Sequence, residues 1–169
     1  ILVQSPLPEG LDANIAFRTI SPKKDVDGFN PINVGLRTIG DKEGFVPCTP
    51  LGIMRMLEEY NVELAGKNVV IVGRGKLVGR PLITLMLAKD ATVTVCHSKT
   101  TNLAEMTKMA DVLVVACGVP NLITADMVKD DVVVIDAGIN RIDGKLCGDV
   151  DFEAVSKKAS LITALLRDG

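Results

Sequence analysis

The sequence predicts an α/β fold, in which a Rossmann-like, doubly wound parallel sheet is joined to part of a second α/β domain. From Lys67 onward, short β-branched runs alternate with segments of helical apolar spacing, a pattern typical of βαβ units. A glycine-rich turn, Gly73-Arg74-Gly75, follows the first of these runs and precedes a helical segment. The first 66 residues lack this rhythm and carry six of the eight prolines. The chain therefore contains two different units.

The first unit is expected to begin in a strand and to continue through helices and loops. Its expected elements are a strand end at Ile1–Gln4, a helix at Ala13–Ile20, a turn-rich loop at Asp25–Asn33 and a helix at Leu51–Tyr60. Thr49 and Pro50 predict the N-cap and the first residue of the last helix. Because a chain that starts inside a strand is unusual, we expect further residues ahead of Ile1.

The second unit is expected to form the parallel sheet. Its expected strands are Asn68–Val72, Ala91–Cys96, Asp111–Ala116 and Val132–Asp136, and its expected helices are Leu77–Ala88, Asn102–Met109 and Thr124–Val128. Asp143 and Gly144 predict the turn of a hairpin over Arg141–Cys147. A helix at Phe152–Lys158 and a last strand at Ser160–Thr163 complete the unit.

The glycine-rich turn is the clearest sign of function. Gly73 and Gly75 let the backbone turn tightly and approach a diphosphate, whose charge is met by the N–H groups at the start of the next helix. With Gly79 the spacing is Gly-x-Gly-x-x-x-Gly, one residue longer than the usual dinucleotide fingerprint. The sequence therefore predicts a dinucleotide site at this turn.

The end of the second strand indicates which dinucleotide binds. Dinucleotide-binding proteins often place a carboxylate there for the ribose diol, but this chain has His97, Ser98 and Lys99. A hydroxyl and a cation, together with Arg74, suit a 2′-phosphate and favour NADP over NAD. His97, the only histidine, is more often a packing residue in such a place than an acid or base.

Composition and charge exclude several classes of function. The net charge of −2 and the pI near 5.4 offer no basic field for nucleic acid or for an anionic membrane. No apolar run approaches the roughly 20 residues of a membrane helix, and we expect a cytoplasmic protein. Its four cysteines are far apart and are expected to be buried, reduced thiols, so no metal site is predicted. They are Cys48, Cys96, Cys117 and Cys147.

Two loops of the first unit place polar groups on constrained backbone. Gln4 lies beside Pro6, and Asp25 and Asp27 precede Gly28. Asp25 and Asp27 are alternate residues, so in extended backbone they point in opposite directions. At most one of them is expected to face a substrate.

Together these segments resemble one enzyme family in order along the chain. The matching segments are Ile1-Leu2-Val3-Gln4, Pro6-Leu7-Pro8, Lys24-Asp25-Val26-Asp27-Gly28-Phe29, Pro47-Cys48-Thr49-Pro50, Val72-Gly73-Arg74, Val78-Gly79-Arg80-Pro81, Cys96-His97-Ser98, Asp136, Gly138-Ile139-Asn140 and Gly148-Asp149-Val150. They resemble the bifunctional methylenetetrahydrofolate dehydrogenase/methenyltetrahydrofolate cyclohydrolase family.

The resemblance implies NADP-dependent oxidation of 5,10-methylenetetrahydrofolate to the methenyl form and hydrolysis of that product to 10-formyltetrahydrofolate. It implies that Gln4 supports the catalytic lysine and that Asp27 binds the pterin ring, while Gly73, Gly75 and the neighbouring positions hold NADP. Those neighbouring positions are Arg74, Ser98 and Ile139. It also implies a homodimer that handles tetrahydrofolate one-carbon derivatives for purine and amino-acid biosynthesis.

The resemblance also suggests domain limits. Residues 1–50 would be part of an N-terminal catalytic and folate-binding domain, residues 51–66 a linking helix and turn, and residues 67–163 the NADP-binding domain. Residues 164–169 would start a C-terminal helix after a missing loop, so we expect a break between Thr163 and Ala164.

The sequence departs from the family at three places. The family's catalytic lysine, in a Tyr-x-x-x-Lys pattern, is expected ahead of Ile1. Gly75 stands where the family has a serine, and the family's Pro-Val-Pro-Gly-Gly-Val-Gly-Pro loop does not follow Thr163. Two other functions therefore stay open: a non-catalytic NADP-binding or assembly module, and another Rossmann oxidoreductase such as an amino-acid or shikimate-type dehydrogenase. Gln4 and the loop at Asp25 disfavour the last of these.

Overall fold

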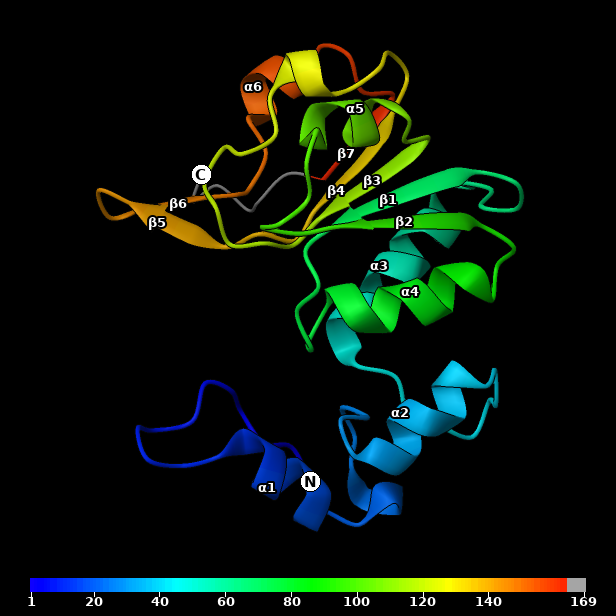
Figure 1. Cartoon of the computed structure of the whole chain (residues 1–169), viewed down its shortest axis with the longest axis vertical. Helices are drawn as coiled ribbons and strands as arrows, with labels where there is room; N and C mark the ends of the chain where they lie inside the picture. Colours follow the sequence, from blue (N-terminus) through cyan, green and yellow to red (C-terminus); the bar gives the residue numbers. More distant parts are fainter. Residues whose placement is uncertain (164–169) are drawn as a thin grey trace.

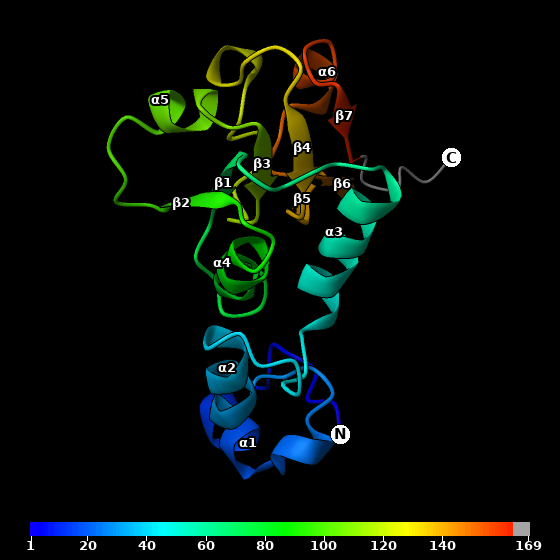
Figure 2. The same cartoon turned by 90° about the vertical axis from the view of Figure 1, so that its right-hand side faces the viewer.

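The computed structural model describes residues 1–163, and the expected chain break and C-terminal helix lie outside them. Residues 1–47 form an N-terminal unit, and residues 48–163 form a sheet unit (Figure 1). Figure 2 shows that the helix α3 (Cys48–Glu59) leaves the N-terminal unit and runs along the sheet unit. No helix within the described residues is long and apolar enough to cross a membrane.

The sheet unit is built on five parallel strands. The elements in chain order are β1 (Asn68–Val72), α4 (Gly79–Leu87), β2 (Thr92–Cys96), α5 (Leu103–Lys108), β3 (Val112–Val115), η2 (Ala125–Met127), β4 (Val133–Asp136), β5 (Asn140–Ile142), β6 (Lys145–Cys147), α6 (Phe152–Val155) and β7 (Leu161–Ile162). The strand order is β2-β1-β3-β4-β7, and β5 and β6 form a separate antiparallel hairpin. The predicted doubly wound sheet and hairpin are confirmed.

The strands are apolar throughout because both faces of the sheet are covered. Val70 and Val72 point to a core that also receives residues of α5, η2 and α6. Val69 and Ile71 point to the opposite core, which is closed by α3 and α4. Side chains alternate between the faces of a strand, so a strand buried on both sides needs no polar positions.

The order of the strands creates a switch point between β1 and β3. From β1 the chain moves outward to β2 and then returns to place β3 on the other side of β1. In open parallel sheets, ligands bind beyond the carboxyl ends of the strands at such a point. The glycine-rich turn leaves β1 at this position.

The N-terminal unit contains helices and turns. They are α1 (Ala13–Thr19), the 3₁₀ turn η1 (Pro22–Lys24) and α2 (Pro31–Thr38). All of residues 1–47 are described and none is in a strand, so the strand expected at Ile1–Gln4 is wrong. A strand requires a neighbour to complete its hydrogen-bond ladder. Ile1 and Leu2 have no such neighbour here and are 60% and 55% exposed.

Two helix starts differ from the prediction. The loop expected over Asp25–Asn33 ends at Asn30, whose side chain accepts a hydrogen bond from the N–H of Ile32 (2.9 Å) and caps α2. Helix α3 begins at Cys48, so Thr49 is not its N-cap and Pro50 is its third residue. Proline is tolerated there because the first N–H groups of a helix have no intrahelical partner.

The helix expected over Phe152–Lys158 is also shorter. It ends at Val155, and Ser156 is its C-cap. Beyond it, the ammonium group of Lys158 donates to the carbonyl oxygens of Ala125 and Val128, at 3.1 and 2.7 Å. These bonds attach the segment to η2 and so replace the continuation of the helix.

Candidate cofactor site at the carboxyl edge of the sheet

The turn between β1 and α4 requires glycine at two positions. Gly73 has φ +121°, and a Cβ there would lie 2.1 Å from the carbonyl oxygen of Ala116. A Cβ on Gly79 would lie 2.1 Å from the carbonyl oxygen of Gly73. Both contacts are with backbone, which no change of rotamer relieves. The turn therefore brings β1, β3 and the start of α4 into direct backbone contact.

Gly75 has a different environment. A Cβ at this position would meet no atom within 4 Å, and the residue is exposed. The packing of the chain itself does not require glycine here. The open space beside Gly75 is where the backbone remains accessible to a ligand.

Arg74 and Ser98 lie at matching positions beyond neighbouring strands. Val72 and Cys96 are paired in the register of β1 and β2, and Arg74 and Ser98 each follow two residues later. Both side chains are exposed. The main-chain N–H of Gly73 donates to the carbonyl oxygen of Cys96 (2.9 Å), which holds the two strand ends together. The edge thus presents a guanidinium and a hydroxyl from adjacent strands.

His97 takes part in the turn that carries Ser98. Its Nδ1 accepts a hydrogen bond from the N–H of Lys99 (3.1 Å), and its own N–H donates to Oγ1 of Thr100 (2.8 Å). Nδ1 is therefore engaged by backbone. The histidine helps to shape the strand end.

Two carboxylates hold the other loops at this edge, and neither has a role that was predicted from the sequence. Asp149 is fully buried, and its Oδ2 accepts the N–H groups of Cys117 (2.7 Å) and Gly118 (2.9 Å). Its Oδ1 accepts from the amide of Asn140 (2.7 Å). Asp149 therefore ties the loops after β3, β4 and β6 to one another.

Asp136 supports this arrangement from the end of β4. Its carboxylate accepts the N–H groups of Gly138 (2.9 Å), Asp149 (3.1 Å) and Val150 (3.0 Å). A Cβ on Gly138 would lie 2.2 Å from Cγ of Asp149, and one on Gly148 would lie 1.9 Å from Oδ2 of Asp136. A glycine beside each carboxylate is the sequence signal that points to these close approaches.

The surroundings shift three pKa values in this cluster. Burial raises the pKa of Cys117 to about 11, and the hydrogen bond to Asp149 adds to the shift. Burial also raises the pKa of Asp136, although three backbone N–H groups oppose it. Burial acts the same way on Asp149, but hydrogen bonds from Asn140, Cys117 and Gly118 outweigh it and hold its pKa below the usual range. Asp149 is thus an anion stabilised by N–H donors, and within residues 1–163 it forms no ion pair with a cation.

Ile139 is carried on the loop that these carboxylates hold. It lies between Gly138 and Asn140 and is 75% exposed. An aliphatic side chain this exposed, on a restrained loop, offers an apolar surface at the carboxyl edge of the sheet.

In the N-terminal unit, the two aspartates have separate roles. Asp25 is buried, and its Oδ2 accepts from the N–H of Asn30 (2.7 Å) and from the amide of Asn33 (3.0 Å). Asp27 is only partly buried, and the thiol of Cys48 donates to its Oδ1 (3.5 Å). Asp25 is therefore structural, which leaves Asp27 as the accessible carboxylate of this loop.

Gln4 and Asp27 have no hydrogen bond with the glycine-rich turn among the described residues. Gln4 is exposed, and its only recorded hydrogen bond goes to the carbonyl oxygen of Ser5 (3.4 Å). The side-chain contact that links this unit to the turn is between Lys76 and Asn14, with Nζ to Oδ1 at 2.7 Å. The structure thus brings Arg74, Gly75 and Ser98 to one edge and leaves Gln4 and Asp27 on the other unit.

The cysteines differ from the expectation of four buried thiols. All four are free, but only Cys96 is buried and Cys48 is exposed, while Cys117 and Cys147 are partly buried. Cys48 is exposed because it occupies the first turn of α3 at the junction of the two units. Within residues 1–163, no group of three or more His, Cys, Asp or Glu side chains is placed to hold a metal ion.

Comparison with known proteins shows which family and which relatives this chain is similar to. Residues 47–167 match the family model described as tetrahydrofolate dehydrogenase/cyclohydrolase, NAD(P)-binding domain. The chain is 57% identical over 163 residues to the bifunctional protein FolD of Exiguobacterium sibiricum. It is 58% identical over 163 residues to the protein of the same name from Halalkalibacterium halodurans. Each alignment covers 96% of this chain but only 58% of the relative.

Solved structures agree with the sequence matches. The bifunctional FolD methylenetetrahydrofolate dehydrogenase/cyclohydrolase of Campylobacter jejuni superposes with a TM-score of 0.95 at 50% identity, covering 97% of this chain and 58% of that one. The Trypanosoma brucei enzyme, described as complexed with NADP cofactor and inhibitor, gives a TM-score of 0.91 at 38% identity. The alignment covers 98% of this chain and 59% of the Trypanosoma brucei chain.

Proposed function

This chain belongs to the tetrahydrofolate dehydrogenase/cyclohydrolase family, and we propose that it is part of an enzyme of one-carbon folate metabolism. The proposed reactions are the NADP-dependent oxidation of 5,10-methylenetetrahydrofolate to the methenyl form and the hydrolysis of that form to 10-formyltetrahydrofolate. The names of its relatives support an enzyme over a non-catalytic NADP-binding module.

The observation that carries the proposal is the arrangement of Gly75, Arg74 and Ser98 at the carboxyl edge of the sheet. The space beside Gly75 admits a diphosphate close to the backbone at the start of α4. Arg74 and Ser98 come from adjacent strands, and no carboxylate lies in residues 97–101 to repel a 2′-phosphate. These residues fit NADP, which in such an enzyme accepts the hydride from the one-carbon bridge.

The remaining residues would position the nicotinamide and the folate. Ile139 presents its aliphatic side chain beside the crevice, on a loop held by Asp136 and Asp149. Asp27 is the accessible carboxylate of the N-terminal unit and would bind the pterin ring, while Gln4 would support the catalytic lysine of the family. The domain limits at residues 50, 66 and 163 remain part of this proposal.

The proposal also covers the oligomeric state of the enzyme and its place in the cell. We infer that the enzyme acts as a homodimer in the cytoplasm and supplies one-carbon units for purine and amino-acid biosynthesis. The family membership and the absence of a membrane-spanning helix among the described residues support this placement.

Cofactor preference provides the direct test. Arg74→Ala should weaken NADP binding by about 1.5–3 kcal/mol, because a guanidinium paired with a phosphate makes charge-assisted hydrogen bonds. NAD binding should change little. Arg55→Ala removes another exposed arginine, on α3, and serves as the control in calorimetric titration with both cofactors. Equal losses for NADP and NAD in Arg74→Ala would show that this residue does not contact the 2′-phosphate.

The folate assignment needs a separate variant. Asp27→Asn, tested in the complete enzyme, should impair turnover of 5,10-methylenetetrahydrofolate and leave NADP affinity nearly intact, because Asp27 lies on the N-terminal unit. A large loss of NADP affinity with normal turnover would place Asp27 on the cofactor side instead.

A further inference from the structure

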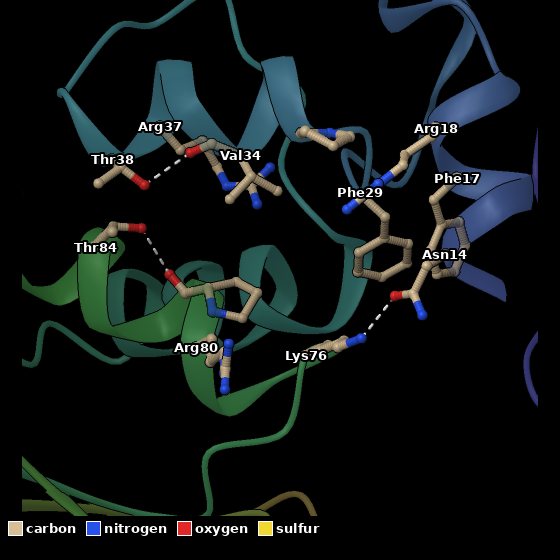
Figure 3. A pocket seen from close by; sticks show the side chains of 12 residues that line it. Asn14, Phe17, Arg18, Phe29, Val34, Arg37, Thr38, Lys76, Arg80 and Thr84 are labelled. Atoms are coloured by element: carbon tan, nitrogen blue, oxygen red, sulfur yellow. Dashed lines mark hydrogen bonds between the residues drawn. The ribbon is translucent and has the colours of Figure 1, made fainter. Parts of the chain in front are cut away.

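A cavity of about 370 Å³ lies between the N-terminal unit and α4, next to the glycine-rich turn. Figure 3 shows side chains of α1, α2 and α4 converging on it from three directions. Neither Arg74, Gly75 nor Ser98 lines it. It is therefore separate from the proposed cofactor site, although α4 borders both.

The lining of this cavity is strongly cationic. Arg18, Arg37, Lys76 and Arg80 all contribute to it, and its lining residues include no aspartate or glutamate. Within residues 1–163, none of these four side chains forms an ion pair with a carboxylate. Four positive charges around one small space repel one another unless an anion lies among them.

Three of the four cations form hydrogen bonds within residues 1–163, and these bonds are made with neutral groups. Lys76 donates to Asn14 and Arg80 donates to the carbonyl oxygen of Arg74 (3.2 Å). Nη1 of Arg37 donates to the carbonyl oxygens of Gly28 (2.7 Å) and Phe45. These bonds hold the cationic groups in place without neutralising their charge, and Arg37 has only the nearby Asp25 as a partial counter-charge.

Arg37 gives independent evidence of an incomplete site. Arg37 lines the cavity although the residue is only 8% exposed, and its Nε has no hydrogen-bond partner in the described chain. A buried donor without a partner costs free energy and is rare in a native structure. Burial also lowers the pKa of Arg37, and the nearby Asp25 only partly opposes this effect. An anion in the cavity would stabilise this buried charge.

The other side of the cavity is aromatic. Phe17 and Phe29 pack against each other with ring centroids 5.0 Å apart, and both line the space that the cations surround. Planar rings bind on such a surface by stacking. The volume lies near the lower end of the range for small-molecule sites, about 300–1,000 Å³, which suits a mononucleotide better than a dinucleotide.

From this geometry we propose that the cavity is a second anion site, which binds a nucleoside monophosphate with its phosphate among the four cations and its base against Phe17 and Phe29. A ligand in this position contacts both the N-terminal unit and α4. It therefore links the N-terminal unit to the helix that begins at the cofactor turn.

Calorimetric titration of AMP into the purified chain, already saturated with NADP, tests the site. We expect one AMP bound per chain, with an affinity that falls as salt is raised because charge dominates the contact. Arg18→Gln should weaken AMP about tenfold or more, since it removes one charge-assisted contact without disturbing a recorded hydrogen bond. Arg55→Gln, which also removes one exposed arginine, should leave AMP binding unchanged.

Two further titrations distinguish the contribution of the base from that of the phosphate in the proposed ligand. Adenosine and inorganic phosphate should each bind far more weakly than AMP. Equal affinity for adenosine would overturn the role of the cations, and equal affinity for inorganic phosphate would overturn the role of the aromatic pair. No binding of AMP beside NADP, or full affinity in Arg18→Gln, would overturn the site itself. The cofactor proposal does not depend on these results, because its test is the response of NADP to Arg74→Ala.

Discussion

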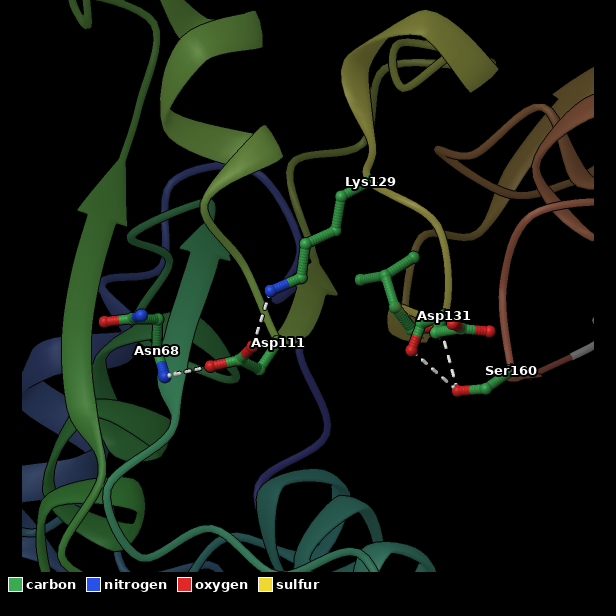
Figure 4. Close-up of polar contacts among 6 residues, drawn as sticks. Asn68, Asp111, Lys129, Asp131 and Ser160 are labelled. Carbon is green, nitrogen blue, oxygen red and sulfur yellow. Dashed lines mark hydrogen bonds and ion pairs between the residues drawn. The ribbon is translucent and has the colours of Figure 1, made fainter.

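The two ends of the parallel sheet are both held by aspartates, but the partners of those aspartates differ. At the amino end, Asp111 accepts the N–H of Asn68 (2.8 Å) and forms an ion pair with Lys129 (2.5 Å), as Figure 4 shows. At the carboxyl end, the buried Asp149 accepts hydrogen bonds from N–H donors and a thiol of the described residues. The amino end is therefore held by a partly exposed ion pair, in which Lys129 neutralises the charge of Asp111.

This difference separates the charges that stabilise the fold from the charges that are available to bind a ligand. Figure 4 also shows Ser160 donating to the carbonyl oxygen of Asp131 (2.9 Å), so the amino end is closed by short contacts between neighbouring strand starts. At the carboxyl end, the loops are held by Asp136 and Asp149, which form no ion pair within residues 1–163. Arg74 is exposed at the edge where an anionic cofactor is expected, and it too has no ion-pair partner among these residues.

The largest effect is expected from Asp149→Ala. The change leaves the N–H groups of Cys117 and Gly118 and the amide of Asn140 without their acceptor. These three groups are only partly buried or exposed, so each costs near the lower end of the range of about 1–3 kcal/mol for an unsatisfied group, and the variant should lose roughly 3–4 kcal/mol of unfolding free energy. Urea unfolding measures this loss, and a change below about 1 kcal/mol would contradict the role of Asp149 as the anchor of this edge.

A matched pair of glycine substitutions gives the next effect. Gly73→Ala should lose about 3 kcal/mol of stability, because its Cβ meets the Ala116 carbonyl and its φ of +121° is unfavourable for alanine. Gly75→Ala should fold with nearly normal stability, since its Cβ meets nothing. Thermal unfolding compares the two variants. NADP titration should then show weaker binding in Gly75→Ala, whereas equal destabilisation of both would contradict the structure of the turn.

The amino end should tolerate substitution better. Asp111→Asn removes the charge that pairs with Lys129, and the two side chains are 30% and 40% exposed. Partly exposed pairs contribute about 1 kcal/mol or less, so the loss should be small. Urea unfolding of Asp111→Asn beside Asp149→Ala tests the comparison directly, and similar losses for the two would remove the distinction between the ends.

The smallest expected effect is that the unfolding free energy lost in Asp111→Asn depends on pH. The hydrogen bond from Lys129 holds the pKa of Asp111 below its usual value, and the N–H of Asn68 adds to this shift. A depressed pKa adds stability above the unfolded value, about 3.9, and that stability is lost as the pH falls through the folded pKa. The difference between the wild type and Asp111→Asn should therefore be full near pH 6 and vanish in strong acid. A difference that grows on acidification would have the wrong sign.

Most of the sheet unit was predictable because its local and tertiary preferences agree. The run Val69–Val72 is buried on both faces, so a β-branched sequence and the environment of the strand favour the same structure. Within the site, the positions of Arg74, Gly75 and Ser98 at one edge also followed from the alternation of strands and helices. Their roles in binding stay predictions.

The N-terminal unit was less predictable because short signals compete there. Asn30 and Pro31 form a clear helix start, yet they lie directly after a loop rich in polar residues that suggested continued turns. The strand expected at Ile1–Gln4 depends on a neighbouring strand, which no local pattern supplies.

The sequence by itself determined the strands of the parallel sheet, the glycine turn and the hairpin, because each of these elements is formed by residues that are close together in the chain. Only the tertiary structure decided that Asp149 anchors Cys117 and Asn140, and that Arg18 and Arg80 surround one cavity. These groups are separated by many residues, and no local period relates them. Their interactions depend on how the loops and helices meet in space, where burial and distance set the strength of each charge and hydrogen bond.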